Sequence, residues 1–226
     1  MSNYSKFSDI NAVINKAEKS LKDIENQYNK YLEQKIIPDS LLVEVKDCLG
    51  NLRSALDYLW NKIPNSNGGY FPIANSLADF QNKVKAIDVT YQKTLEKWQD
   101  YDSNSWITSF NLFRNKNTHV TLIPQKRTET QRIVSEHVGG GSVSWDPNSV
   151  RFGSGVYING APVNPLTQMP ITTPDATVRR EIWVDFLFDG VSISPNFPQN
   201  VSVIPFLKKS LENVKNIITD IEPLIK

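Results

Sequence analysis

The chain has 226 residues, of which 39% are hydrophobic and 22% charged, so a wholly disordered chain is excluded. Its 25 Lys and Arg residues nearly balance 24 Asp and Glu residues, which argues against a protein that coats DNA through clustered cations. The single cysteine, Cys48, excludes an intramolecular disulfide scaffold. No apolar run approaches the roughly 20 residues of a membrane span, and the start lacks a signal peptide's apolar core. We therefore expect a soluble, cytoplasmic protein with no membrane partner.

The first third of the chain has helical periodicity. Apolar residues recur at three- and four-residue steps over 10–32, which predicts one long helix that ends before Pro38. A second helix, capped by Asp39 or Ser40, should end before Pro64. Its apolar stripe comprises Val45, Cys48, Leu49, Leu52, Ala55, Leu56 and Leu59. Two such helices joined by a short link predict an antiparallel hairpin.

Shorter helices should follow a glycine-rich loop. The Asn and Gly residues over 65–69 favour a tight turn. Helices are then expected over 76–87, over 91–98 and from about residue 103 to residue 117. The side chains of the first of these that should point inward are Leu77, Phe80, Val84 and Ile87.

From Thr118 the pattern changes from helical to alternating. Short β-branched and aromatic runs between Gly, Asn and Pro residues predict strands over 120–124, 131–138, 142–145, 150–152, 156–158 and 177–188. Asn159 and Gly160 predict a turn, and 161–175 a proline-containing loop. In the longest strand, one face should carry Val178, Ile182, Val184, Phe186 and Phe188.

A final helix over 202–225 completes the expected fold. Its apolar stripe should pack on the sheet or on the N-terminal helices. The fold class is therefore α+β. A helical bundle would occupy residues 1–117, and an antiparallel β-region with the closing C-terminal helix residues 118–226. The closing helix could join the two parts into one cooperative unit.

Few residues in this sequence can carry catalysis. One of the two histidines, His137, lies on an expected strand, where we predict a structural or solvent-facing role. The other, His119, ends the run that starts at Arg114, an Arg-x4-His spacing at the end of a helix. One cysteine and two separated histidines do not form a zinc-type ligand set. The sequence also lacks a Walker loop, a dinucleotide fingerprint and a Gly-x-Ser-x-Gly elbow, so we expect no metal and no cofactor.

An arginine and a histidine suffice in principle to cleave RNA without a metal ion. His119 could take the proton of the 2′-hydroxyl or protonate the leaving oxygen, and Arg114 could neutralise the growing phosphoryl charge. Asn115 would orient a phosphate oxygen or the imidazole. Alternatively, Arg114 and His119 cap carbonyls at the C-terminus of their helix, where cations are favoured.

The second helix resembles a known motif. Residues 47–59, Asp-Cys-Leu-Gly-Asn-Leu-Arg-Ser-Ala-Leu-Asp-Tyr-Leu, are similar to an Asp-Cys-Leu-His-Asn-Leu-Arg-Ser-Ala-Leu-Asp-His-Leu segment in a family of uncharacterised bacterial and phage proteins. A Phe-Pro-Ile loop follows in both, here over 71–73. Asn115 and His119 match a later Asn-x3-His segment, and other positions of that segment differ. Gly50 and Tyr58 replace two histidines of the family. This resemblance implies an architecture more than an activity.

The helical half also resembles HEPN domains, which are helical bundles, usually dimers. Many of them are metal-independent ribonucleases that use an Arg-x4–6-His motif, and Arg114 and His119 fit that motif. This chain departs from the pattern in the strand-like residues 120–123, where a HEPN bundle would continue as helix. The resemblance implies single-stranded RNA as a partner, a homodimer through the helical half, and no action on DNA.

A polar face of the second helix has two interpretations. Gly50, Arg53, Ser54 and Asp57 follow helical spacing and share one face. Arg53 and Asp57 could form a structural ion pair in the bundle or in a dimer interface. Alternatively, Asn51, Arg53 and Asp57 support the site of Arg114 and His119. A mid-helix glycine costs about 1 kcal/mol, which close helix approach at Gly50 could offset.

The sequence thus leaves two classes of function. The leading prediction is a HEPN-like RNA-cleaving or RNA-binding protein, in a phage, defence or toxin system. The alternative is a non-catalytic module that binds a ligand or protein in the cleft between helices and sheet. Seven aromatic residues are expected in the core rather than as platforms on which bases stack. They are Trp60, Tyr70, Phe71, Trp98, Trp106, Trp145 and Trp183.

Overall fold

The computed structural model describes residues 6–101, 105–119, 121–189 and 200–225, and only the backbone of Thr118 and His119. Its helices are α1 (Ser8–Gln34), α2 (Asp39–Lys62), α3 (Leu77–Val84), α4 (Val89–Glu96), α5 (Trp106–His119) and α6 (Val203–Ile221), followed by the short 3₁₀ helix η1 (Glu222–Leu224). Its strands are β1 (Gln125–His137), β2 (Ser142–Trp145), β3 (Tyr157–Ile158), β4 (Ala161–Asn164), β5 (Met169–Pro170) and β6 (Ala176–Phe188). The mixed helix and strand content confirms the α+β class.

The chain divides into two compact units. The helical unit comprises residues 1–126 and 186–226, and the β-unit comprises residues 127–185. The sequence-based boundary placed the closing helix with the β-region. However, α6 packs on α1, α2 and α4, and its apolar stripe is buried there. Packing on the N-terminal helices was one of the two expected arrangements.

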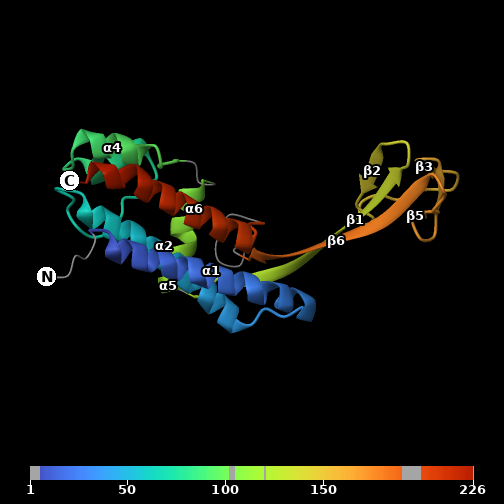
Figure 1. Cartoon of the computed structure of the whole chain (residues 1–226), viewed down its shortest axis with the longest axis horizontal. Helices are drawn as coiled ribbons and strands as arrows, with labels where there is room; N and C mark the ends of the chain where they lie inside the picture. The colour runs from blue at the N-terminus through green and yellow to red at the C-terminus, as the bar shows by residue number, and fades with distance from the viewer. Residues whose placement is uncertain (1–5, 102–104, 120, 190–199, 226) are drawn as a thin grey trace. The chain divides into compact units, whose positions relative to one another are not determined.

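The helical hairpin of α1 and α2 forms the centre of the helical unit, with α6 alongside both helices (Figure 1). The stripes predicted for both helices are buried, except for Val13, Tyr31 and Leu32 of α1, which are partly buried. Lys35 ends α1 in the left-handed conformation with φ 58°. The expected cap of α2 was wrong. Pro38 occupies the N-cap position, and no side chain accepts a capping hydrogen bond there.

Aromatic side chains from distant segments complete the core of the helical unit. Phe113 of α5 stacks on Phe188 at the end of β6, with ring centroids 4.4 Å apart, and meets Phe206 of α6 at 4.8 Å. In contrast, Leu77 at the start of α3 is exposed rather than buried. It is the first helical residue after the N-cap Ser76, and the buried residues of α3, Phe80 and Val84, lie further along the helix.

Two small antiparallel sheets make up the strand content. The first has the order β2-β1-β6, and Ile133 of β1 pairs with Trp145 of β2. The second has the order β3-β4-β5. The strands β4 and β5 form within the segment expected to be a loop. No strand covers 150–152, and Val150 and Phe152 instead pack against the small core around Trp145.

The segment after α5 is not a strand over 121–124, contrary to expectation. Most of its described backbone bonds go to the end of α5, and only the Pro124 carbonyl bonds beside the sheet, where it accepts from the Asp189 N–H after β6 at 2.8 Å. Oδ1 of the buried Asn117 accepts a hydrogen bond from the Ile123 N–H at 2.8 Å, and the Lys116 carbonyl accepts one from the Thr121 N–H at 3.1 Å. These bonds replace the ladder partners that a strand would require.

Within the described residues, none of the helices combines the length and apolar character needed to cross a membrane.

Candidate functional site

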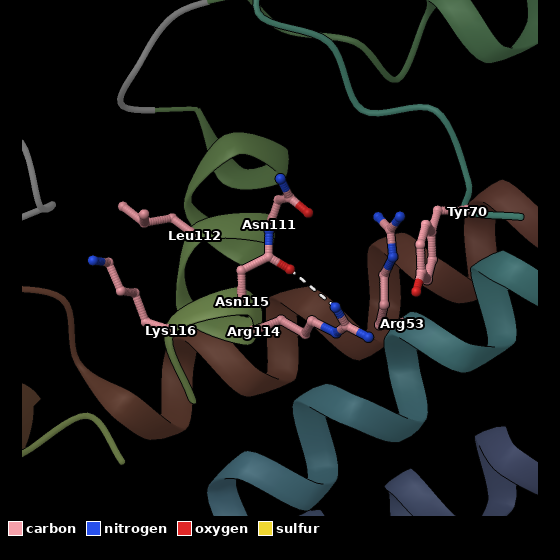
Figure 2. A pocket seen from close by; sticks show the side chains of 7 residues that line it. All are labelled: Arg53, Tyr70, Asn111, Leu112, Arg114, Asn115 and Lys116. Atoms are coloured by element: carbon pink, nitrogen blue, oxygen red, sulfur yellow. Dashed lines mark hydrogen bonds between the residues drawn. The ribbon is translucent and has the colours of Figure 1, made fainter. Parts of the chain in front are cut away.

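A cavity of about 420 Å³ joins α2, α5 and the loop after α2, and it brings together two arginines of the predicted site. Figure 2 shows Arg114 reaching from α5 toward Arg53 on α2, with the ring of Tyr70 on the other side of Arg53. We call this cavity the arginine pocket. Its lining residues are Arg53, Tyr70, Asn111, Leu112, Arg114, Asn115 and Lys116.

Arg53 is almost fully buried, with a relative exposure of 5%. Its Nη2 donates a hydrogen bond to the Phe71 carbonyl at 2.9 Å. Its Nε lies 3.1 Å from Oδ1 of Asp57, which is ion-pair distance, although the N–H direction does not meet hydrogen-bond geometry. The predicted ion pair of Arg53 and Asp57 is therefore present, one helical turn apart on α2.

The same ion pair fixes the loop that follows α2. Oδ1 of Asp57 accepts a hydrogen bond from the Phe71 N–H at 2.8 Å, so both backbone groups of Phe71 are bound to α2. Asn61 also donates to the Gly69 carbonyl at 3.3 Å. Tyr70, between these anchored residues, is 71% exposed and its ring centroid lies 5.9 Å from Cζ of Arg53. The expectation that Tyr70 belongs to the core was wrong, because the loop is held by its backbone and not by this ring.

The positive charge of Arg53 is incompletely compensated. Its Nη1 is buried and has no hydrogen-bond partner among the described residues. Burial lowers the pKa of Arg53, Asp57 opposes that effect, and the charge of Arg114 adds to it. Arginine remains protonated in proteins, so Arg53 and Arg114 place two positive charges at this pocket, and the carboxylate of Asp57 offsets one of them. An anion in the arginine pocket would offset the other charge.

Arg114 and two asparagines present polar groups from α5. Nη1 of Arg114 donates to Oδ1 of Asn115 at 3.0 Å (Figure 2). Asn111 precedes Asn115 by four residues and lines the same pocket. His119, the last residue of α5, follows Asn115 by four residues, but its side chain is outside the described part of the chain. The structure thus places Arg114 and Asn115 together and leaves His119 as a sequence prediction.

Two further cavities adjoin the arginine pocket. One, of about 350 Å³, is lined by Arg114 together with Gly50, Asn51 and Ser54 of α2. The other, of about 400 Å³, shares Arg53 and Tyr70 with the arginine pocket. A Cβ atom at Gly50 would meet nothing within 4 Å, so the expected close helix approach at Gly50 is wrong. The glycine instead leaves space beside Asn51.

Cations predominate around the three cavities. Among the described residues, their linings hold six cationic side chains and one carboxylate, that of Asp47. Three of the cations already form ion pairs, namely Lys46 with Asp47, Arg53 with Asp57 and Lys83 with Asp79. The six are Lys16, Lys46, Arg53, Lys83, Arg114 and Lys116. Because the whole chain carries a net charge of only +1, this concentration is local. Such a surface favours an anionic ligand.

The predicted supporting residues have different roles. Asn51 lines a cavity with Arg114, Arg53 lines the arginine pocket, and Asp57 does not line it but binds Arg53. Sequence reasoning missed Tyr70 and Asn111 as pocket residues. The position of Tyr70 directly after two glycines, both with positive φ, was the available signal of an exposed turn residue.

Comparisons of this chain with protein family models, with curated protein sequences and with solved structures found no match.

Proposed function

We propose that this chain binds single-stranded RNA by a backbone phosphate in the arginine pocket, and that it cleaves the RNA there without a metal ion, as a HEPN-like ribonuclease. The observation that carries the proposal is that two guanidinium groups, those of Arg53 and Arg114, line one pocket. A phosphate offers charge and several acceptor oxygens to such a pair of guanidinium groups.

The remaining pocket residues suit a nucleotide better than a small inorganic anion. The exposed ring of Tyr70 provides a face on which a base can stack. The amides of Asn111 and Asn115 can donate to or accept from a ribose or phosphate. Lys116 in the arginine pocket and Lys16 in a neighbouring cavity extend the positive surface beyond one phosphate, as a chain of nucleotides requires.

Cleavage needs a proton acceptor near the 2′-hydroxyl, and His119 is the candidate from the sequence. Its imidazole would take the 2′-hydroxyl proton as the 2′-oxygen attacks phosphorus, the bond from phosphorus to the 5′-oxygen would break, and the imidazolium would return that proton to the 5′-oxygen directly or through water. Arg53 and Arg114 would stabilise the charge on the phosphoryl oxygens. The products would carry a 2′,3′-cyclic phosphate and a 5′-hydroxyl.

The test incubates a mixed single-stranded RNA pool in EDTA with the wild-type chain and with His119→Ala. We expect His119→Ala to lower the cleavage rate by about 10²–10⁴-fold, and Arg114→Ala by a comparable factor. His137→Ala is the matched control, because His137 is the only other histidine, is exposed and lies in the β-unit. It should change the rate by less than a few-fold. DNA should not be cleaved, because it lacks the 2′-hydroxyl.

A binding assay separates recognition from catalysis. Arg53→Gln and Arg114→Gln should each weaken RNA binding and reduce the slope of log affinity against log salt by about 0.7 if one phosphate contact is lost. If the wild-type chain binds RNA but does not cleave it, the protein is an RNA-binding protein and the proposed cleavage is refuted. Absence of both would refute the proposal and favour a module that binds another ligand or a protein.

A further inference from the structure

A separate cavity of about 470 Å³ lies within the β-unit, where β2 ends beside β1. It is lined by two tryptophans, Trp145 of β2 and Trp183 of β6, and by polar side chains of β1 and of the turn after β2. No part of the proposed RNA site belongs to it, so an inference about this cavity is independent of the RNA proposal.

Trp183 is on the surface, contrary to the expectation that it is a core residue. It is 47% exposed, and Cζ of Arg132 lies 5.9 Å from its ring centroid. Tryptophan buries a large apolar area when it packs, so an indole left half exposed beside a cavity is a ready platform for a ligand. Its neighbour Ile182 is similarly exposed, at 52%, but does not line the cavity.

Trp145 forms a second aromatic wall of the cavity. It is only 7% exposed and packs edge to face on Phe152, with ring centroids 5.2 Å apart. Its Nε1 is buried and has no hydrogen-bond partner in the described part of the chain. The exposed part of Trp145 therefore adds apolar surface to the wall of the cavity, next to Trp183.

The polar lining of the cavity balances donors and acceptors. Arg132 offers guanidinium N–H groups, and Asp146 offers a carboxylate of the opposite charge. The two oxygens of Asp146 accept from the Asn148 N–H at 2.8 Å and from Oγ of Ser149 at 3.0 Å, and each keeps a further lone pair. A phosphate would be repelled by Asp146, whereas neighbouring hydroxyl groups can donate to Asp146 and accept from Arg132 at the same time.

We propose that this cavity binds a neutral saccharide. The C–H face of the sugar ring would stack on Trp183, and its hydroxyl groups would bond with Arg132 and Asp146. An uncharged ligand with an apolar face and a rim of hydroxyl groups matches an indole flanked by one donor and one acceptor of opposite charge. A nucleic acid matches less well, because its phosphates would meet Asp146.

The experiment titrates the full chain with neutral tetrasaccharides of glucose and of N-acetylglucosamine, and separately with a single-stranded oligonucleotide. Binding is measured by calorimetry. We expect saturable binding of at least one saccharide with a dissociation constant tighter than about 10 mM. Trp183→Ala should weaken this binding by at least about tenfold through loss of the stacking surface, and Trp183→Phe should retain part of the affinity.

Ile182→Ala is the matched control, because Ile182 is the adjacent residue on β6 and has similar exposure. It should leave the affinity within about twofold. Circular dichroism of each variant checks that the β-unit is still folded. The proposal is overturned if none of the saccharides binds, if only the oligonucleotide binds, or if Trp183→Ala and Ile182→Ala have equal effects. Because RNA cleavage is measured separately, failure here leaves the RNA proposal unaffected.

Discussion

Replacing Asp57 with asparagine tests the electrostatic account of the arginine pocket. The substitution removes the carboxylate that lies 3.1 Å from Nε of Arg53 and keeps an oxygen that can accept from the Phe71 N–H. The side chains of Arg53 and Asp57 are 6% and 15% exposed, so water cannot replace the lost charge. Loss of one partner of a buried ion pair typically costs 3–5 kcal/mol, and the partial exposure of Asp57 places the expected cost near 3 kcal/mol.

The measurement is urea unfolding followed by the helical signal in circular dichroism, which reports mainly on the helical unit. A loss of about 3 kcal/mol would lower the midpoint by roughly 1–2 M urea at a typical slope. The control is Glu25→Gln, which breaks the exposed ion pair with Lys208 between α1 and α6. It should cost less than about 1 kcal/mol, because exposed ion pairs contribute little to stability.

Two further measurements test whether the loss of stability in Asp57→Asn comes from the unpaired charge of Arg53. The double variant Asp57→Asn/Arg53→Met should lose less stability than the sum of the two single variants, because no unpaired charge remains. Inorganic phosphate should stabilise Asp57→Asn, by about 1.4 kcal/mol at ten times its dissociation constant. The reasoning is refuted if Asp57→Asn costs no more than Glu25→Gln, or if the effects of Asp57→Asn and Arg53→Met are additive.

Other predictions concern single residues of the helical unit and the β-unit. Gly50→Ala should raise the free energy of unfolding by about 1 kcal/mol, because a Cβ atom there meets open space and alanine favours the helix; a loss of stability would contradict this. The expected homodimer should appear in light scattering at micromolar concentrations, and if Gly50→Ala dissociates it, a partner packs on this face of α2. Burial raises the pKa of the Cys48 thiol to about 12, so a thiol reagent at pH 8 should modify it only after unfolding; rapid labelling of the native chain would show that α1 and α2 open locally. His137→Ala should leave the melting temperature nearly unchanged, since the exposed ring accepts one turn hydrogen bond from the Gly139 N–H, and a large decrease would show that this turn controls the β-unit.

The sequence alone was sufficient for the long helices. The stripes of α1, α2 and α6 run for several turns each, and an apolar stripe of that length can only be buried by helix packing. The turn at Asn159 and Gly160 was also predictable, since both residues adopt positive φ. The ion pair of Arg53 and Asp57 could be predicted because it is local, one turn apart on a helix.

The site itself required the tertiary structure. Arg53 and Arg114 belong to different helices, and only the packing of α2 with α5 places them in one pocket. Tyr70 and Trp183 are large aromatic residues of the kind usually found in a core, yet both are exposed. For Tyr70 the reason is tertiary, because Asp57 holds the backbone of the neighbouring Phe71. Short strands such as β4 and β5 carry too few residues for a periodic pattern, so their pairing partners decided their structure. Local spacing therefore determined the helices, and contacts between residues far apart in the sequence determined which charges and aromatic rings remain available to a ligand.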